Sequence, residues 1–282
     1  MKIAHLILAY NYPVMLERLV RRLQHEEADI YIQLDKKAPI ENFAHLENIN
    51  NVCFVKNRIK TEWGDYSIIE ATIAGFNSIL ESGIAYSHIN LLSEQDYPLR
   101  PINQFHEFLS ANTDKTFMHS LSIADDEWED GKVRLLKYSL GDYNIPGKYT
   151  LQVIANRFLP NRKIPGNLKP YGRSQWITIT PECARYAIDY IKTKPKLKRF
   201  FRMTWAVDEV FFQIILVNSA LNDKLVNDNL RHIEQYGANR PKIFTINDAG
   251  TLITSGKFFA RKFDDNVDTA IYDRLDAEIG YA

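Results

Sequence analysis

Three short groups of charged residues in this sequence could carry out chemistry. The first is Glu94 and Asp96, which follow an uncharged, largely apolar run at residues 86–92 and precede Pro98. Such a run predicts a buried strand, which the proline ends because it cannot continue a β-ladder. Ligands bind beyond the carboxyl ends of strands in open α/β sheets. The two carboxylates could hold a divalent cation there, or Asp96 could fix the turn while Glu94 is solvated.

The second group is the pair Asp208-Glu209, which precedes the apolar stretch at residues 210–217. Acidic residues are favoured at a helix N-terminus by the helix dipole, so a capping role is one interpretation. The other follows from the apolar surroundings, which raise the proton affinity of a carboxylate and suit it to act as a general base toward a hydroxyl. Glu209 is the better candidate for that base if Asp208 is the capping residue.

The third group is basic and lies among phenylalanines near the end of the sequence. Lys257, Arg261 and Lys262 form it, and Arg231 and Arg240 come earlier, in segments expected to be extended. Converging cations can neutralise a diphosphate leaving group without a metal ion. The alternative is a solvated basic loop that is paired with the two aspartates after it.

The elements that must position these groups alternate between strands and helices, which predicts an α/β fold that opens as a parallel sheet. Strands are expected at residues 3–9, 29–35, 51–55, 86–92, 116–119, 171–180 and 230–233. Helices are expected to begin at Pro13 and to cover residues 65–80, 102–109, 181–191, 208–217, 246–254 and 267–279, with Asp65 as a cap and residues 192–202 as a basic linker. Residues 120–170 fit the alternation least, and we interpret them as an excursion that covers the site or contacts a substrate.

The totals describe an ordinary globular chain. It has 282 residues, with 35 Lys and Arg against 35 Asp and Glu, so no global field attracts nucleic acid or a membrane. Cys53 and Cys183 lie on segments expected to be in the core and should be buried, reduced thiols. Without a signal peptide, a membrane span or a glycine-rich phosphate loop, the sequence predicts a soluble cytoplasmic protein with no classical dinucleotide site.

Six sequence blocks in order resemble the core-2/I-branching β-1,6-N-acetylglucosaminyltransferase and peptide O-xylosyltransferase family (glycosyltransferase family 14). The resemblance spans roughly residues 3–265, and its blocks are Tyr10-Asn11-Tyr12-Pro13, Trp63-Gly64 with Ser67, residues 92–99, Ser174-Gln175-Trp176, Asp208-Glu209 and residues 259–263. The resemblance implies a single GT-A domain over residues 1–282, with a mixed, mostly parallel sheet flanked by helices and residues 120–170 as an acceptor-side insertion. It implies an inverting enzyme that moves a sugar from a UDP-sugar to a glycan hydroxyl and forms a β-linkage.

The resemblance also implies roles for individual residues. Glu209 matches the catalytic base, and Lys262 matches the basic residue that contacts the diphosphate. Arg261 and Arg240 are further diphosphate candidates, although Arg240 matches only after a one-residue shift. The remaining nucleotide-sugar candidates are Asp35, Trp63 and Asp96. The acceptor candidates are Trp128, Arg134, Tyr138, Ser174 and Trp176.

The branching enzymes of this family work without a metal, so the resemblance implies that none is required here. Glu94 stands where the family has a small residue, however, so a metal ion is not excluded. The sequence lacks the signal anchor, stem and many cysteines of the animal enzymes, which suggests a compact bacterial form that acts in the cytoplasm on a glycan or lipid-linked glycan. GlcNAc and xylose are the expected donor sugars. Peripheral contact with a membrane stays open, and no nucleic-acid partner is expected. The alternatives are a metal-dependent transferase that uses Glu94 and Asp96, or a carbohydrate-binding protein without activity.

Overall fold

The computed structural model describes residues 1–236 and 240–280, and the side chains of Tyr236 and Arg240 are outside this description. Within these residues the centre of the protein is a seven-stranded sheet with the order β3-β2-β1-β4-β7-β6-β8. Strands β1 to β4 run parallel to one another, whereas β7 is antiparallel to both of its neighbours, β4 and β6. The prediction of a mixed, mostly parallel sheet flanked by helices is therefore confirmed.

The strands of this sheet cover most of the predicted strand positions. They are β1 (Lys2–Ala9), β2 (Ala28–Leu34), β3 (Val52–Phe54), β4 (Tyr86–Ser93), β6 (Thr116–Ser122), β7 (Tyr171–Ile179) and β8 (Leu225–Val226). The helices are α1 (Pro13–Arg22), α2 (Ser67–Leu80), α3 (Ile102–Ser110), α4 (Glu129–Leu136), α5 (Lys148–Phe158), α6 (Pro181–Lys192), α7 (Pro195–Arg202), α8 (Phe211–Val217), α9 (Ala249–Thr254) and α10 (Ala270–Glu278).

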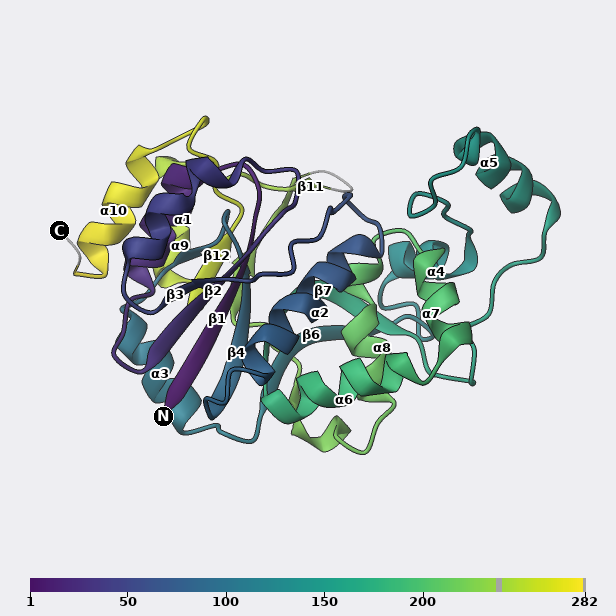
Figure 1. Cartoon of the computed structure of the whole chain (residues 1–282), viewed down its shortest axis with the longest axis horizontal. Coiled ribbons are helices and arrows are strands. Elements are labelled where there is room, and N and C mark those ends of the chain that lie inside the picture. Colours follow the sequence, from purple (N-terminus) through teal and green to yellow (C-terminus); the bar gives the residue numbers. More distant parts are fainter. Residues whose placement is uncertain (237–239, 281–282) are drawn as a thin grey trace.

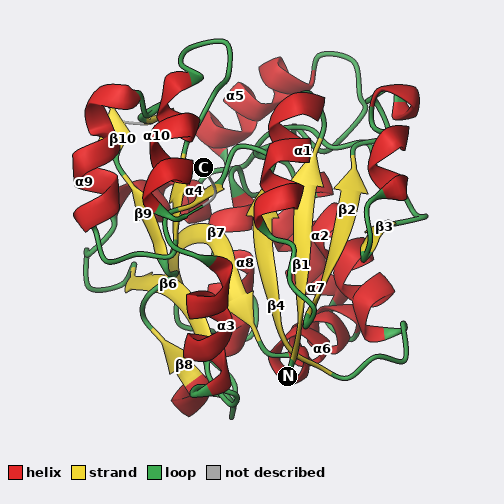
Figure 2. Cartoon of the chain, turned by 90° about the vertical axis from the view of Figure 1, so that its left-hand side faces the viewer, coloured by secondary structure: helices red, strands yellow, loops and turns green. Residues whose placement is uncertain are grey.

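Helices cover both faces of the sheet, as Figures 1 and 2 show. One core forms between the sheet and helices α2, α6, α7 and α8, and the other forms between the sheet and helices α1 and α3. Because both faces are covered, every residue of β2 is buried, including the polar Asp29 and Gln33. This double burial explains why Asp29 and Gln33, which alternate with apolar residues along β2, are buried together with them.

A smaller sheet lies beside the carboxyl end of β4 and carries the basic cluster. Its strands are β5 (Tyr97–Pro98), β12 (Phe259–Arg261) and β9 (Arg231–Ile233), with β12 in the middle. Two further short strands, β10 (Gln235–Tyr236) and β11 (Arg240–Pro241), pair with each other. A third core forms where this sheet meets α9 and α10. The phenylalanine-rich segment thus forms a central strand, which fixes Arg261 at the edge of the main sheet.

Helix α10 is fastened to the N-terminal part of the fold by one buried carboxylate. Asp276 accepts hydrogen bonds from Arg18 at 2.6 Å, from Arg22 at 2.7 Å and from the Tyr97 hydroxyl at 2.6 Å. Burial acts to raise the pKa of Asp276, but these hydrogen bonds outweigh it, so the pKa lies below its ordinary value. The ionised carboxylate therefore stabilises the docking of α10 against α1.

Several local predictions were wrong. Cys53 is exposed on the edge strand β3, and only Cys183 has the buried position expected for both cysteines. Asp65 makes no capping hydrogen bond to α2. Residues 195–202 of the supposed linker form α7, because Leu197, Phe200 and Phe201 provide a buried apolar face at helical spacing.

Candidate functional site

Two cavities adjoin at the carboxyl ends of the parallel strands. The first, called here the strand-end cavity, has a volume of about 470 Å³ and is lined by residues that follow β1, β2 and β4 together with Arg261 and Lys262. The second, called the tryptophan cavity, has a volume of about 580 Å³ and extends toward the excursion at residues 120–170. Their common wall consists of Trp63, Gln175, Trp176, Asp208 and Arg261.

Glu94 at the end of β4 organises the loop after β1. Its carboxylate accepts hydrogen bonds from the backbone N–H groups of Tyr10 and Asn11, each at 3.0 Å, and of Tyr12 at 3.3 Å. Burial raises the pKa of Glu94 above its ordinary value, although the three N–H groups oppose that shift. These contacts correct the interpretation of Glu94 as a solvated side chain, because it holds a loop of the strand-end cavity in place.

Asp35 has a similar position at the end of β2. Its carboxylate accepts hydrogen bonds from the backbone N–H of Lys37 at 2.6 Å and from the N–H of Thr61 at 3.0 Å, and also from the Thr61 hydroxyl. These bonds connect the end of β2 to the loop that carries Trp63, whose side chain is 77% exposed and lines both cavities. The sequence placed Asp35 and Trp63 in one nucleotide-sugar site, and the structure brings both to the strand-end cavity.

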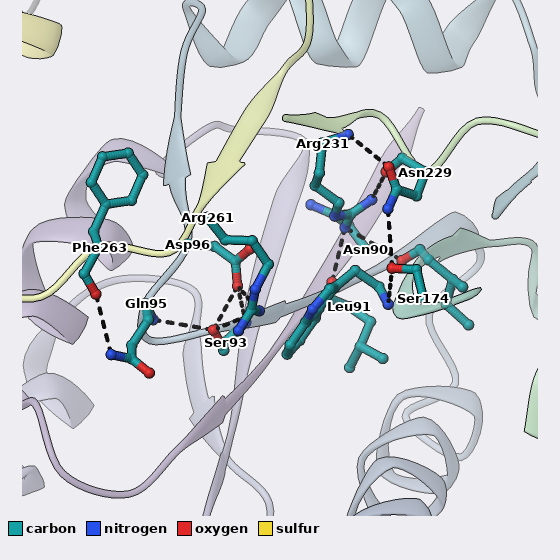
Figure 3. A network of polar contacts seen from close by, with 12 residues as sticks. Asn90, Leu91, Ser93, Gln95, Asp96, Ser174, Asn229, Arg231, Arg261 and Phe263 are labelled. Carbon is teal, nitrogen blue, oxygen red and sulfur yellow. Dashed lines mark hydrogen bonds and ion pairs between the residues drawn. The ribbon is translucent and has the colours of Figure 1, made fainter. Parts of the chain in front are cut away.

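Arg261 and Lys262 supply the positive charge of this cavity. Arg261 donates to Ser93 Oγ and Asp96 Oδ2, both at 3.2 Å (Figure 3). Its guanidinium lies 3.9 Å from the centre of the Trp176 ring. Burial lowers the pKa of Arg261, and the charge of Asp96 partly opposes this shift. Burial also lowers the pKa of Lys262, and the neighbouring charge of Arg261 lowers it further. Two adjacent cations that are poorly solvated favour a bound anion.

Asp96 is involved in the turn at the end of β4. Its Oδ2 accepts the backbone N–H and the hydroxyl of Ser93, both at 2.6 Å, in addition to Arg261. Its Oδ1 is buried without a hydrogen-bond partner among the described residues. Across residues 1–236 and 240–280, no group of three or more His, Cys, Asp or Glu side chains is placed to hold a metal ion. Asp96 thus fixes both the turn and the position of Arg261.

All four tryptophans of the chain line the tryptophan cavity: Trp63, Trp128, Trp176 and Trp205. Indole rings present flat apolar faces with one polar N–H, which suits the C–H faces and hydroxyls of a sugar ring. Trp63 and Trp205 stack edge to face, with 5.2 Å between ring centres. Ser174 also lines this cavity, and its hydroxyl accepts a hydrogen bond from Asn229 at 3.1 Å.

Glu209 lines the tryptophan cavity and forms an ion pair with Arg134 from α4. The guanidinium of Arg134 lies 4.9 Å from the ring centres of both Trp128 and Trp205, so it is held between two indoles while it orients the carboxylate. Trp128 and Arg134, both predicted acceptor residues, are thus brought together with the predicted base.

Asp208 lies at the common wall of the two cavities, and its Oδ1 is buried without a partner in the described part of the chain. Burial, and secondarily the charge of Glu209, raises the pKa of Asp208 to about 7. Neither Asp208 nor Glu209 makes a side-chain capping bond: they form a separate 3-10 turn, Val207–Glu209, before α8 begins at Phe211. Asp208 is therefore not a side-chain cap of α8, although both carboxylates lie just before the N-terminus of that helix.

Three further predicted residues have different outcomes: Tyr138 is away from both cavities, the side chain of Arg240 is not described, and Arg231 lines the tryptophan cavity but is buried. Tyr138 is not among the described residues that line either cavity, and its hydroxyl donates to the Pro160 carbonyl at 3.5 Å. Arg240 belongs to β11, but its side chain lies outside the described residues. Arg231 is buried in a network with Asn90, Leu91 and other groups that joins β9 to β4, as Figure 3 shows, so it is occupied by the protein itself.

The sequence reasoning missed two features of this site. Trp205 was not among the predicted site residues, although its ring and that of Trp128 enclose the guanidinium of Arg134. Gly172 on β7 was not singled out, yet a Cβ there would lie 2.5 Å from the Trp128 ring and 2.8 Å from the Glu209 carbonyl oxygen. No local pattern marks such a position, because the close approach joins three segments distant in sequence.

Cationic strand ends beside an aromatic, carboxylate-bearing cavity have the chemistry needed to bind phosphate and carbohydrate groups. The family model described as "Branch: Core-2/I-Branching enzyme" matches residues 3–252, and the chain belongs to this family. The matched residues include both acidic pairs, Glu94 with Asp96 and Asp208 with Glu209. Arg261 and Lys262 lie beyond the end of the match.

Among curated proteins, the chain is similar to xylosyltransferase 2 of Canis lupus familiaris, with 26% identity over 98% of this chain and 33% of that protein. It is similar to xylosyltransferase 1 of Rattus norvegicus, with 26% identity over 93% of this chain and 33% of that protein. The chain thus spans about a third of the length of these relatives. A structure titled WbbM bifunctional glycosyltransferase has a TM-score of 0.41 and 12% identity, over 99% of this chain and 49% of that one.

Proposed function

We propose that this chain is an inverting glycosyltransferase that moves a sugar from a UDP-sugar to a hydroxyl of a glycan and forms a β-linkage. The observation that carries the proposal is the position of Glu209 in the tryptophan cavity, next to Asp208 in the wall that this cavity shares with the strand-end cavity. The strand-end cavity holds Lys262, the tryptophan cavity holds all four tryptophans, and Arg261 lies in the wall between them. The names of the related proteins support xylose as the first donor sugar to test, with GlcNAc as the second.

The proposed reaction is a single displacement. Glu209 accepts the proton of the acceptor hydroxyl while the hydroxyl oxygen forms a bond to the anomeric carbon, and the bond from that carbon to the diphosphate oxygen breaks. UDP leaves with the bonding electron pair, and Arg261 and Lys262 stabilise the charge that develops on it. Arg134 orients the Glu209 carboxylate, and its neighbouring indoles exclude water from the reacting hydroxyl.

Glu209→Gln tests this assignment because it removes the base and keeps the shape. We expect turnover, measured as UDP released with acceptor present, to fall by about 10²–10⁴, the usual contribution of a positioned general base. UDP binding measured by calorimetry should persist, because Glu209 lies on the tryptophan side of the site. Asp130→Asn, an exposed carboxylate on the same cavity, is the matched control. Near-normal turnover of Glu209→Gln would contradict the assignment.

A metal-dependent reaction through Glu94 and Asp96 is the second candidate, favoured by the unpartnered Asp96 Oδ1. We propose instead that no metal is required, since both Glu94 oxygens already accept backbone N–H groups and Asp96 Oδ2 holds Arg261. Full activity in excess EDTA supports the metal-free reaction, and loss that added Mn²⁺ or Mg²⁺ restores supports the other. A bacterial source, a role in polysaccharide synthesis and a cytoplasmic location stay predictions.

A further inference from the structure

Helix α5 projects from the body of the protein at one end of its long axis (Figure 1). None of its residues is buried. It is attached through polar side chains: Gln152 accepts the backbone N–H of Leu140 at 2.8 Å, and Asn156 accepts the N–H of Tyr138 at 2.7 Å and donates to its carbonyl at 2.9 Å. The polar side of α5 therefore faces the protein.

The apolar side chains of α5 face solvent. The exposed apolar residues of the helix are Tyr149, Leu151, Val153, Ile154 and Phe158, followed by Leu159 just after it. Val153 is 68% exposed and Phe158 is 78% exposed. An amphipathic helix on a globular protein normally buries its apolar stripe, so this arrangement is reversed. Several large apolar side chains exposed on one short helix indicate an interaction site.

Basic residues predominate in the sequence of α5, of the segment after it and of α7, although Asp142 before α5 pairs with Arg202 of α7. Residues 143–181 contain six Lys or Arg and no Asp or Glu, and residues 190–207 contain another six and again no acid. Helix α7 lies in the second stretch and buries Leu197, Phe200 and Phe201, which leaves its basic side chains exposed. The balanced total charge of the chain thus conceals a strongly basic end.

The two basic stretches are joined in space. Arg162, just after α5, donates to the carbonyl of Met203 at 2.5 Å and also to that of Phe200. Arg202 at the end of α7 donates to Asp142, just before α5, at 2.5 Å. Figure 1 shows α5 and α7 at the same end of the molecule. The segments on both sides of α5 therefore contact the C-terminal end of α7, which keeps the exposed apolar helix and the basic helix at the same end of the protein.

We propose that α5 and α7 dock this protein onto an anionic lipid bilayer. The exposed side chains of α5 enter the boundary between head groups and acyl chains, and the lysines of α7 attract the anionic head groups. A second copy of the chain fits this surface less well, because a symmetric contact would bring two basic ends together. Docking is peripheral: no helix in the described residues has both the length and the apolar character to cross a bilayer.

The position of this surface bears on the acceptor. Trp128 and Arg134 of the tryptophan cavity belong to the same excursion as α5. If the proposed transferase function holds, docking would hold this cavity near the head groups of a lipid-linked glycan. The docking itself does not depend on that function and is tested by binding alone.

Vesicle co-sedimentation tests the proposal. We expect the chain to bind vesicles of equal parts phosphatidylcholine and phosphatidylglycerol, to bind vesicles of phosphatidylcholine alone at least about tenfold more weakly, and to be released by salt. The triple variant Leu151→Ser, Val153→Ser, Phe158→Ser should weaken binding by about tenfold or more for each side chain. Because these side chains are exposed, the variant should fold normally, which its thermal unfolding checks.

The matched control changes three exposed apolar residues elsewhere: Val14→Ser, Ile84→Ser and Val267→Ser. It should bind vesicles like the unchanged chain. Equal binding to neutral and anionic vesicles, or equal loss in both triple variants, would overturn the proposal. A dimer in lipid-free solution that the α5 variant abolishes would also overturn it and would assign the surface to a second copy of the chain.

Discussion

Asp208→Asn should change how the stability of this protein depends on pH. Burial and the neighbouring Glu209 raise the pKa of Asp208 from 3.8 to about 7. The folded chain therefore binds a proton at Asp208 more tightly than the unfolded chain does. As a result, the free energy of unfolding falls as pH rises from about 4 to about 7, and above that range the destabilisation by ionised Asp208 is complete. The asparagine cannot ionise and should avoid this loss.

The magnitude follows from the shift. About three pKa units at about 1.36 kcal/mol each give a total of about 4 kcal/mol. Roughly 2–3 kcal/mol of this destabilisation should appear between about pH 5 and pH 8, the range in which the unchanged chain and Asp208→Asn are compared. We treat these values as upper limits, because the residue as a whole is half buried even though its Oδ1 is sealed from solvent.

Urea unfolding of both proteins across this pH range measures the effect. Asp208→Asn should gain stability relative to the unchanged chain as pH rises, with the largest difference at the alkaline end. Asp130→Asn controls for the loss of one carboxylate from the same cavity. A difference between Asp208→Asn and the unchanged chain that is constant with pH would refute the reasoning, since it would mean that Asp208 ionises alike in the folded and unfolded chains.

Three further outcomes follow from the structure. Lys262→Ala should weaken UDP binding by about tenfold in calorimetry, because it removes a poorly solvated cation from the strand-end cavity, and unchanged affinity would contradict that role. Gly172→Ala should lower transfer by about tenfold or more while UDP binding persists, since its Cβ would displace the Trp128 ring; normal turnover would disprove that close approach. Asp276→Asn should cost about 3–5 kcal/mol at neutral pH in urea unfolding, because Arg18 and Arg22 each lose a charged partner. Since the pKa of Asp276 is lowered in the folded chain, that difference should shrink as pH falls below about 4 and vanish once the folded carboxylate is itself protonated; a pH-independent difference would argue against an ionised Asp276.

The sequence was sufficient for most of the elements. The strands at residues 2–9, 28–34 and 86–93 are apolar because the sheet is covered on both faces, and that burial is visible as local composition. Helix α1 was recognisable from Pro13 and the spacing of its apolar residues. Helix α7 was missed because its lysines and arginines outnumber the three residues that it buries.

The site was predicted in part, and the part that failed depended on distant contacts. The sequence singled out Glu209, Arg261 and Lys262 as candidates, because charged residues beside apolar segments stand out locally, and all three line the two cavities. It could not show that Glu94 accepts the N–H groups of a loop more than eighty residues away, nor that Arg134 is held between two indoles. Such partners are set by chain packing and leave no local pattern.

By itself, then, the sequence determined the α/β class, the order of the elements and the residue types available for chemistry, because burial and backbone preference act locally. Tertiary structure decided which of these groups meet. It placed Asp208 at the wall between two cavities and gathered four tryptophans into one of them. It also turned the apolar side of α5 outward, beside a basic helix, in a chain whose total charge is balanced. Proximity of residues distant in sequence depends on the complete packing of the chain.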